Sequence, residues 1–330
     1  MRKKVLQILP MYDPKGEEIL RQSADVIYTE RYDEDHLCQM VKGVHGIVLR
    51  APARITRKII EAADCLEAIS GAGVGVDNID VQAATERGIP VLHAPSLNTN
   101  ATAEHAVALM LSLSKMVVQG DQAMRRNHFA ARDHMRTMEL RGKRLGLVGF
   151  GAIAQRVAEI AGKGFGMQVS VYVRRMDDQR RQRAIELGAS LTTDLQELFA
   201  TSDIVSLHVP LTAETRHLVN RELLDLMQPH ALLINTARGG VVDHHALLHA
   251  LKAKKLAGAA LDVFDPEPPE PSELFQMEQV ISTPHIGGIT REATYQMAVT
   301  VAQNMLKILQ GQPVETVSNP EVLRSCFGSV

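Results

Sequence analysis

Three polar residues follow three apolar runs near the C-terminal end of the chain. Arg238 follows "ALLINTA" (231–237), Glu267 follows "AGAALDVF" (257–264) and His285 lies in "QVISTPHI" (279–286). A guanidinium can hold a carboxylate through two parallel hydrogen bonds, and an imidazole can exchange a proton near neutral pH. A carboxylate beside the imidazole would favour its protonated form and raise its pKa. Together the three predict acid–base chemistry on a small ligand that carries a carboxylate.

Each of these residues also has a simpler interpretation. A lone arginine in a loop is usually a surface charge, and a histidine after Thr-Pro is more often a hydrogen-bonded structural residue. Asp262 also ends an apolar run, and it is either a helix cap or a cofactor contact. The other histidines, His244 and His245 included, form no pattern, and we expect them at the surface or in the core.

The three apolar runs belong to a longer series of predicted strands that alternate with helical patterns. Such alternation predicts parallel βαβ units, and the carboxyl ends of parallel strands are where ligands bind. One long helical pattern, 100–127, separates two series of strands, and an amphipathic pattern over 292–311 closes at Gly311. The expected strands lie at 3–9, 24–30, 46–51, 66–70 and 90–95, then at 143–148, 169–173, 203–209 and the three runs above.

The second series opens on the glycine turn "LGLVGFGAIAQRV", in which Gly149 and Gly151 give G-x-G and Ala154 takes the third position. Alanine is an accepted variant there. The first glycine makes the turn, and the second lets backbone N–H groups approach a pyrophosphate at the positive end of the helix. A strand before the turn and a helix after it predict dinucleotide binding.

A second glycine-rich loop, "SGAGVGVDNID" (70–80), lacks that spacing. Gly73, Val74, Gly75 and Val76 present consecutive backbone amides, which suit a small anion such as a carboxylate. The alternative is a turn that needs glycine torsion angles.

Composition limits the class of protein. The 330 residues are 45% hydrophobic and 22% charged, which is ordinary for a globular protein large enough for two domains. The formal net charge of -2 gives no reason to expect nucleic acid or an anionic membrane as a partner. The three cysteines match no metal-ligand spacing and suggest a reducing compartment, so we expect a cytoplasmic protein without a metal.

The ordered set "GAGVGVDNID", "NTNATAEH", "GFGAIA", "INTARGGVVD", "ALDVFDPEPP" and "TPHIGG" resembles the D-isomer-specific 2-hydroxyacid dehydrogenase family over nearly the whole chain. The family includes glyoxylate/hydroxypyruvate reductases and short-form phosphoglycerate dehydrogenases. The resemblance implies an α/β fold of two Rossmann-like or flavodoxin-like parallel-sheet domains with an active-site cleft between them. A discontinuous substrate domain (1–99 and 288–330) would flank a dinucleotide domain (100–287), and homodimers would pair through the latter.

The resemblance also implies a chemistry, which is hydride transfer between a nicotinamide cofactor and C2 of a small 2-oxo or D-2-hydroxy acid. Arg238 would hold the substrate carboxylate and polarise the carbonyl, His285 would transfer the proton, and Glu267 would pair with His285. The amides at Val74 to Val76 would also hold the carboxylate. The remaining implied cofactor contacts are Thr102, Ala152, Ile153, Val209, Thr236, Ala237, Asp262 and Gly288.

The end of the second strand in this domain departs from the pattern of NAD enzymes. An acid roughly 20 residues beyond the glycine turn normally accepts hydrogen bonds from the adenosine ribose. Here Val173 occupies that position, and Arg174 and Arg175 follow it. Arginines can pair with a 2′-phosphate, so we expect NADP(H) to be favoured over NAD(H). The alternative is that "RRMDDQRRQR" is only the solvated start of a helix.

The sequence leaves alternatives open for the substrate and for whether the protein is an enzyme. Arg50, in "IVLRAP", resembles an arginine that short-form phosphoglycerate dehydrogenases place near the substrate phosphate, although it could also be a surface charge. The chain ends about 20 residues after its last helical pattern, so we expect no appended regulatory domain. A dinucleotide-sensing protein, similar to corepressors on the same fold, is the alternative to an enzyme. Formate oxidation is disfavoured, because formate enzymes of the family carry glutamine where this chain has Glu267.

Overall fold

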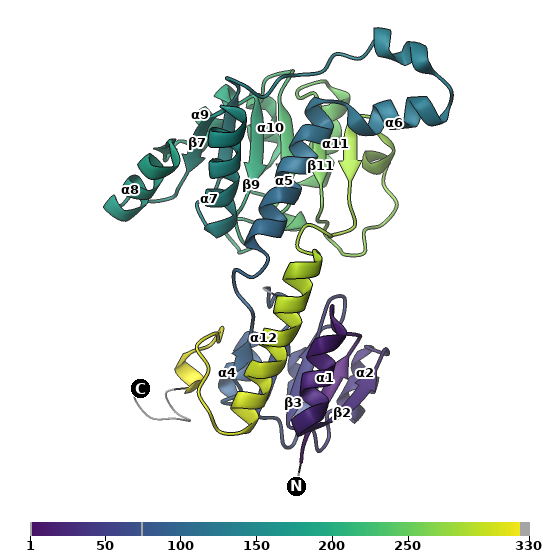
Figure 1. Ribbon diagram of the computed structural model, residues 1–330, viewed down its shortest axis with the longest axis vertical. Helices are drawn as coiled ribbons and strands as arrows, with labels where there is room; N and C mark the ends of the chain where they lie inside the picture. The colour runs from purple at the N-terminus through teal and green to yellow at the C-terminus, as the bar shows by residue number, and fades with distance from the viewer. Residues whose placement is uncertain (1, 74, 324–330) are drawn as a thin grey trace. The chain divides into compact units, whose positions relative to one another are not determined.

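The computed structural model describes residues 2–73 and 75–323, and the chain divides into two compact units (Figure 1). One unit is discontinuous and comprises Met1–Asn98 and Ile289–Val330; the other is Thr99–Gly288. Each unit is built on one parallel sheet. The prediction of an α/β protein with two parallel sheets is therefore confirmed.

The discontinuous unit has a five-stranded sheet in the order β2-β1-β3-β4-β5. This is the flavodoxin-like order, which reverses between β1 and β3. Each strand is short and almost fully buried, except β2, which lies at the edge. The strands are β1 (Lys3–Ile8), β2 (Ala24–Thr29), β3 (Gly46–Leu49), β4 (Ala68–Gly71) and β5 (Val91–Leu92).

Helices cover both faces of this sheet. Helices α1 and α12 pack against each other on one face, and α2, α3 and α4 bury their apolar residues on the other. All five of these helices begin at an Asp or Thr whose side chain accepts a hydrogen bond from an N–H group of the first turn. The helices are α1 (Pro14–Ser23), α2 (Glu34–Met40), α3 (Arg57–Ala62), α4 (Val81–Glu86) and α12 (Arg291–Leu309).

The second unit has a seven-stranded parallel sheet in the order β12-β11-β10-β9-β6-β7-β8. Its chain order reverses between β6 and β9, as in dinucleotide-binding sheets. The strands are β6 (Arg144–Val148), β7 (Gln168–Tyr172), β8 (Ala189–Thr192), β9 (Ile204–Leu207), β10 (Leu232–Asn235), β11 (Gly258–Leu261) and β12 (Val280–Ser282).

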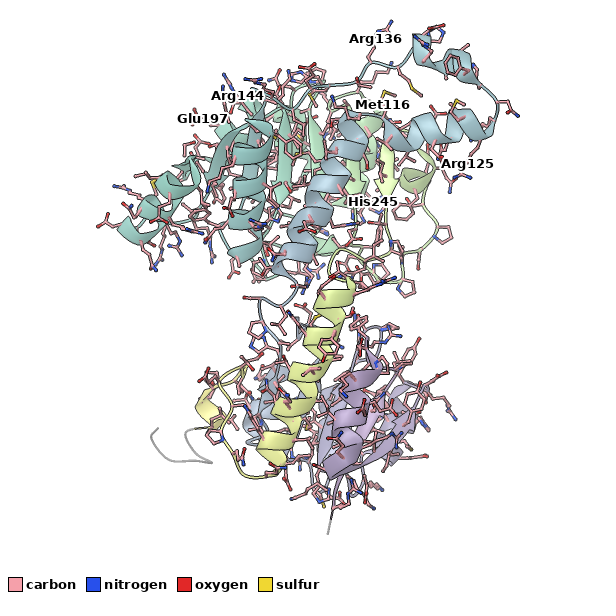
Figure 2. The ribbon with its side chains drawn as sticks, viewed as in Figure 1. Met116, Arg125, Arg136, Arg144, Glu197 and His245 are labelled. Atoms are coloured by element: carbon pink, nitrogen blue, oxygen red, sulfur yellow. The ribbon has the colours of Figure 1, made fainter. Side chains whose placement is uncertain are left out.

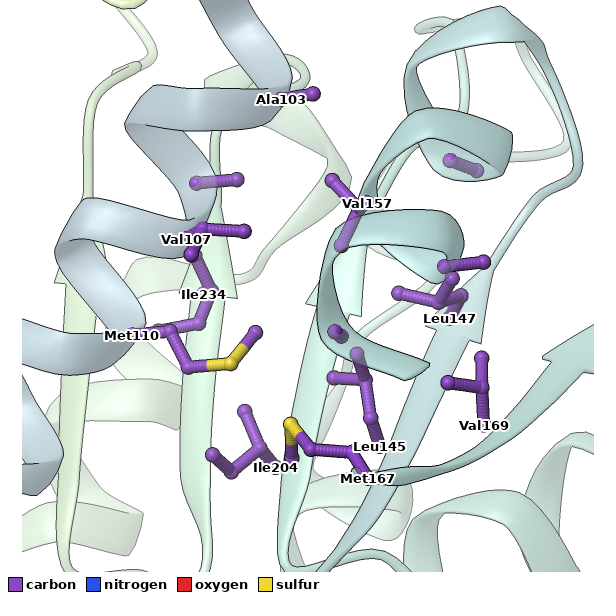
Figure 3. Packing of buried hydrophobic residues seen from close by; sticks show 14 of the residues in the cluster. Ala103, Val107, Met110, Leu145, Leu147, Val157, Met167, Val169, Ile204 and Ile234 are labelled. Atoms are coloured by element: carbon purple, nitrogen blue, oxygen red, sulfur yellow. The ribbon is translucent and has the colours of Figure 1, made fainter. Parts of the chain in front are cut away.

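Two apolar cores sandwich this second sheet. In one of them Val107 and Met110 of α5 face Val157 of α7 above the strands (Figure 3). The other core holds the buried faces of α9, α10 and α11. The helices are α5 (Thr99–Ser114), α6 (Val117–Arg125), α7 (Ala152–Glu159), α8 (Asp178–Leu187), α9 (Leu195–Thr201), α10 (Arg221–Leu226) and α11 (His244–Lys252), with short helical turns at Phe129–Asp133, Ile160–Gly164, Gly239–Val241 and Glu273–Gln276.

The expected single helix over 100–127 is wrong. The chain breaks at Met116, which has a φ of 52°, and α5 and α6 are bent by 60° relative to each other (Figure 2). The apolar pattern continues through the break, so only the left-handed backbone of one residue marks it. Among the described residues no single helix is long and apolar enough to cross a membrane, although this bent pair passes that test when taken together.

Strand β8 was absent from the expected strands. Its residues, "ASLT", are partly exposed at the edge of the sheet and lack the apolar run of the inner strands. The helix end at Gly88 and the one at Gly311 are confirmed, since both glycines adopt positive φ directly after a helix.

Candidate active site

Three adjacent strands of the second unit carry the three polar residues singled out in the sequence. Strands β10, β11 and β12 are neighbours in the sheet, and Arg238, Glu267 and His285 follow their carboxyl ends. The expected pairing of Glu267 with His285 is present, and the charge of Arg238 acts on both. The sheet therefore brings the three together from segments up to 47 residues apart in sequence.

The imidazole of His285 is held from one side. Its Nδ1 lies 2.7 Å from Oε2 of Glu267, and its side chain is 47% exposed. This hydrogen bond raises the pKa of His285 above the ordinary histidine value, and it outweighs partial burial, which lowers that pKa. With Nδ1 bound to the carboxylate, Nε2 is the nitrogen that can exchange a proton with a ligand.

Glu267 is itself oriented by the backbone. Its second oxygen, Oε1, accepts a hydrogen bond of 2.9 Å from the N–H of Phe264. Burial alone would raise the pKa of Glu267, but its hydrogen bond to His285, the charge of His285, the Phe264 N–H and the charge of Arg238 hold that pKa below its usual value. Glu267 is therefore an anion that accepts on both oxygens, and Nδ1 of His285 must be the donor.

The loop that carries Arg238 is held by the buried side chain of Asn235, at the end of β10. Asn235, with no exposed surface, donates from Nδ2 to the carbonyl of Arg238 and accepts at Oδ1 from the N–H of Ala237. The next residue, Gly239, approaches the backbone of Phe264 so closely that any Cβ would overlap it. The loop after β10 therefore packs directly on the loop after β11, and this fixes where Arg238 lies relative to Glu267.

Asp262 is not a helix cap, because no helix begins beside it. Its carboxylate is 2% exposed and accepts from the N–H groups of Ile286 and Gly287, at 2.9 and 2.8 Å. The hydroxyl of Thr283 donates to it at 2.6 Å, and Nε2 of His105 lies 3.3 Å away. Burial would raise the pKa of Asp262, but these partners hold it below the usual value. Asp262 therefore anchors the loop that contains His285.

The glycine turn has the geometry that the sequence predicts. Gly149 has a φ of 104°, and a Cβ on it would lie 2.6 Å from the carbonyl oxygen of His208. A Cβ on Gly151 would meet nothing within 4 Å, so the backbone is open on that side. No side chain caps the N-terminus of α7, which begins at Ala152. Ala154 is fully buried, which fits the close helix–sheet packing required at the third position.

The other candidate cofactor residues of this unit lie in varied settings. Thr236 is buried, and its Oγ1 has no hydrogen-bond partner among the described residues. Thr102 is buried in α5, and Val173 is 6% exposed beyond β7. Ile153 and Val209 pack partly against the two cores, Ala152 is exposed, and Ala237 and Gly288 are half-buried.

Arg174 and Arg175 are both exposed in the turn between β7 and α8. Among the described residues neither guanidinium donates a hydrogen bond, although the charge of Arg174 lowers the pKa of Glu214 as a minor effect after its hydrogen bond to Thr212. Asp177 caps α8 by accepting from the N–H of Arg180. The helix start that formed the alternative interpretation is present, and it leaves both arginines available.

The discontinuous unit holds the remaining candidates. Arg50 follows β3, and its Nε donates to the carbonyl of Pro10 at 2.7 Å while its guanidinium lies over the ring of Tyr12. In the second glycine loop, Gly73 has open space where a Cβ would lie, and Gly75 and Val76 are half-buried. Val74 lies outside the described residues.

Sequence reasoning missed four residues that shape this site: Asn235, Gly239, Thr283 and His105. The first three stand within a few residues of the predicted set, in "INTARGG" and "STPHIGG", so they could have been suspected as supports. His105 comes from a helix far away in sequence, and only the fold brings it near. Within the described part of the chain no group of three or more His, Cys, Asp or Glu could hold a metal ion.

Comparisons with known proteins agree with this geometry. The family model "D-isomer specific 2-hydroxyacid dehydrogenase, NAD binding domain" matches residues 107–287. The chain is 43% identical to a glyoxylate reductase of Pyrococcus furiosus over 88% of this chain and 87% of that protein. It is 38% identical to a D-3-phosphoglycerate dehydrogenase of Methanocaldococcus jannaschii over 96% of this chain, and it spans only 60% of that longer protein.

A solved structure is similar over nearly the full length. The NADPH-dependent glyoxylate/hydroxypyruvate reductase of Sinorhizobium meliloti, in complex with NADP and malonate, has a TM-score of 0.86 at 28% identity. The alignment covers 96% of this chain and 97% of that one. With the family model and the glyoxylate reductase, it shows that the chain belongs to the D-isomer-specific 2-hydroxyacid dehydrogenase family.

Proposed function

We propose that this protein is an NAD(P)-dependent oxidoreductase that interconverts a small 2-oxo acid and the corresponding D-2-hydroxy acid. The observation that carries the proposal is the Glu267–His285 hydrogen bond, which joins the segments after β11 and β12, beside the loop after β10 that carries Arg238. The pair gives a proton donor with a raised pKa beside a guanidinium that can bind a carboxylate.

In this proposal Arg238, His285 and Glu267 each have a separate role. Arg238 binds the carboxylate of the acid and draws electron density from the C2 carbonyl. In reduction, Nε2 of His285 gives its proton to the carbonyl oxygen, and in oxidation the neutral imidazole takes that proton back. Glu267 stabilises the imidazolium and holds the ring so that Nε2 faces the ligand. The nicotinamide, when bound, supplies or accepts the hydride at C2.

The second unit fits a dinucleotide. The open backbone at Gly151 and the uncapped N-terminus of α7 suit a pyrophosphate. The unpartnered Oγ1 of Thr236 is a buried polar atom beyond β10, on the same edge of the sheet, and a ligand would satisfy it. Val209, Thr102, Ala237, Asp262 and Gly288 complete the proposed cofactor contacts.

We further propose a preference for NADP(H). Val173 cannot accept a hydrogen bond from the adenosine ribose, and the exposed guanidinium groups of Arg174 and Arg175 suit a 2′-phosphate. The Sinorhizobium reductase of similar structure is described as NADPH-dependent, which supports this direction.

The names of the relatives point to two kinds of substrate, a small unphosphorylated acid and a phosphorylated one. Their names include glyoxylate reductase, hydroxypyruvate reductase and D-3-phosphoglycerate dehydrogenase. Arg50 and the amides of the second glycine loop are the substrate contacts that we propose in the discontinuous unit. Because these names are those of reductases and dehydrogenases, the dinucleotide-sensing alternative is not favoured.

We also propose a homodimer that pairs through the second unit. Neither α6 nor the short helical turn Phe129–Asp133 buries any residue, and Val117, Met124 and Phe129 are all large, apolar and more than half exposed. A second copy would cover them. Replacing Met124 and Phe129 together by Asp should yield monomers by light scattering, whereas Ile185→Asp, which changes an even more exposed apolar residue on α8, should not.

The decisive experiment is steady-state reduction of glyoxylate, hydroxypyruvate, phosphohydroxypyruvate and pyruvate, each with NADH and with NADPH. Turnover with at least one acid near ~1 s⁻¹ or faster supports the enzyme, and the best acid identifies the substrate class. Dinucleotide binding without turnover of any of these acids would contradict the proposal. The cofactor pair tests the NADP(H) preference separately.

A further inference from the structure

We infer that His105 is a positioning residue that fixes the loop on which His285 stands. The inference rests on the proposed function for its effect on turnover, and on the geometry of the second unit for everything else. His105 lies on the buried helix α5, with a side chain that is 18% exposed.

The hydrogen bonds assign a proton to this histidine. The hydroxyl of Thr283 has one proton, and it donates that proton to Oδ1 of Asp262 at 2.6 Å. Nε2 of His105 lies 3.0 Å from the same hydroxyl oxygen. The oxygen can therefore only accept in this second bond, so Nε2 of His105 must carry a hydrogen.

The same N–H also faces the carboxylate. Nε2 lies 3.3 Å from Oδ1 of Asp262, a carboxylate that is 2% exposed. A buried carboxylate requires donors or a positive charge nearby. Nε2 of His105, the hydroxyl of Thr283 and the N–H groups of Ile286 and Gly287 supply such donors.

Asp262 in turn holds the backbone of the loop that contains His285. Its two oxygens accept from the N–H groups of Ile286 and Gly287, the two residues directly after His285. The ring of His105 also lies close to the loop, because a Cβ built on Gly287 would lie 3.2 Å from its Cδ2 and 2.8 Å from Oδ2 of Asp262. Gly287 is thus the residue that lets the loop lie against the imidazole.

The loop needs such support. His285 has a φ of 54°, a left-handed conformation that is unfavourable for a residue with a side chain. A conformation of this kind persists only where its surroundings hold it. The His105–Thr283–Asp262 network holds Thr283, two residues before His285, and the N–H groups of Ile286 and Gly287 directly after it, while Glu267 holds its side chain. Removing His105 should therefore loosen the loop without touching any group that contacts the acid or reacts.

The test compares His105→Gln with His105→Leu. A glutamine amide can place an N–H close to the position of Nε2, whereas leucine keeps the bulk and loses the donor. His249→Leu is the matched control, because His249 is exposed on α11 in the same unit. Melting temperatures show that each variant is folded.

Hydrogen–deuterium exchange of the full-length protein gives a readout that does not depend on turnover. In His105→Leu the amides of Ile286 and Gly287 should exchange at least about tenfold faster than in the wild type, a rise expected when a local hydrogen bond is lost. His105→Gln should stay within about threefold of the wild type, and so should the control. Unchanged exchange at these two amides in His105→Leu would overturn the inference.

Kinetics with the best acid and cofactor give the second readout. In His105→Leu the value of kcat should fall by about tenfold or more with a much smaller change in KM for the acid, because Arg238 is unaltered. The glutamine variant should recover most of that loss. Equal losses in both variants would mean a merely structural role and would also overturn the inference. If the wild type turns over no acid, the proposed function fails while the exchange result still decides the role of His105.

Discussion

Two arginines follow strands at the same edge of the seven-stranded sheet, but the segments that carry them are held in place to different degrees. The loop of Arg238, after β10, is held by buried Asn235 and by the contact of Gly239 with the backbone of Phe264. Arg174, after β7, lies in an exposed turn, and its guanidinium donates no hydrogen bond among the described residues. Groups that act on reacting atoms need a fixed position, whereas a group that grips an outlying phosphate can be ordered by the ligand itself.

The first prediction removes the most constrained group. His285→Ala should lower kcat for reduction by about 10²- to 10⁴-fold, the usual contribution of a positioned general acid. Cofactor affinity, measured by fluorescence titration, should change little. A loss below about threefold would mean that the hydrogen-bonded edge is not where the proton is transferred.

The second prediction disturbs the packing between the two catalytic loops. Gly239→Ala forces a Cβ against the backbone of Phe264 and should lower the free energy of unfolding by about 1–3 kcal/mol. The value of kcat should fall with it, because Arg238 and Glu267 move apart. Gly164→Ala is the control, since a Cβ there meets nothing within 4 Å, and it should be neutral or stabilising by denaturant unfolding.

The third prediction concerns pH. The carboxylate of Glu267 raises the pKa of His285, so Glu267→Gln should lower that pKa. Reduction needs protonated His285, so the pH above which kcat/KM for reduction declines should move down. In oxidation the neutral imidazole is needed, so activity should appear at a lower pH. Profiles that coincide with those of the wild type would separate Glu267 from proton transfer.

The smallest effect is expected at the open turn. Arg174→Ala and Arg175→Ala should each raise KM for NADPH by about threefold to tenfold, as expected for a partly exposed phosphate contact. KM for NADH and kcat should stay near their wild-type values. If neither variant changes the NADPH constant, these arginines belong only to the start of α8 and the contrast with Arg238 loses its functional meaning.

Most of the candidate catalytic residues at the carboxyl edge of the sheet could be predicted from the sequence, because the local pattern and the topology agree there. Apolar runs of buried parallel strands are legible, and a polar residue directly after such a run must lie at the carboxyl edge. For that reason the sequence alone groups Arg238, Glu267 and His285. The glycine turn was equally legible, because Gly149 needs its positive φ whatever surrounds it.

Features that depend on tertiary contacts could not be predicted from the sequence. His105 looks like any polar residue on a mostly apolar helix until α5 packs beside β11. The break at Met116 has no glycine or proline to mark it, and the edge strand β8 has no apolar run. Propensity is a weak guide where neighbouring elements set the conformation.

The late position of α12 in the chain has a consequence for synthesis on the ribosome. This helix packs on α1 and on β3, β4 and β5, and it buries nine of its residues, yet the whole second unit is made before it. At about 5–20 residues per second, the first strands wait on the order of 10–40 seconds for the helix that covers one face of their sheet. The contiguous unit can complete its core during that interval. The nascent chain therefore exposes an apolar sheet face until α12 has been synthesised, so the first five strands depend on a helix made about 200 residues later to bury that face.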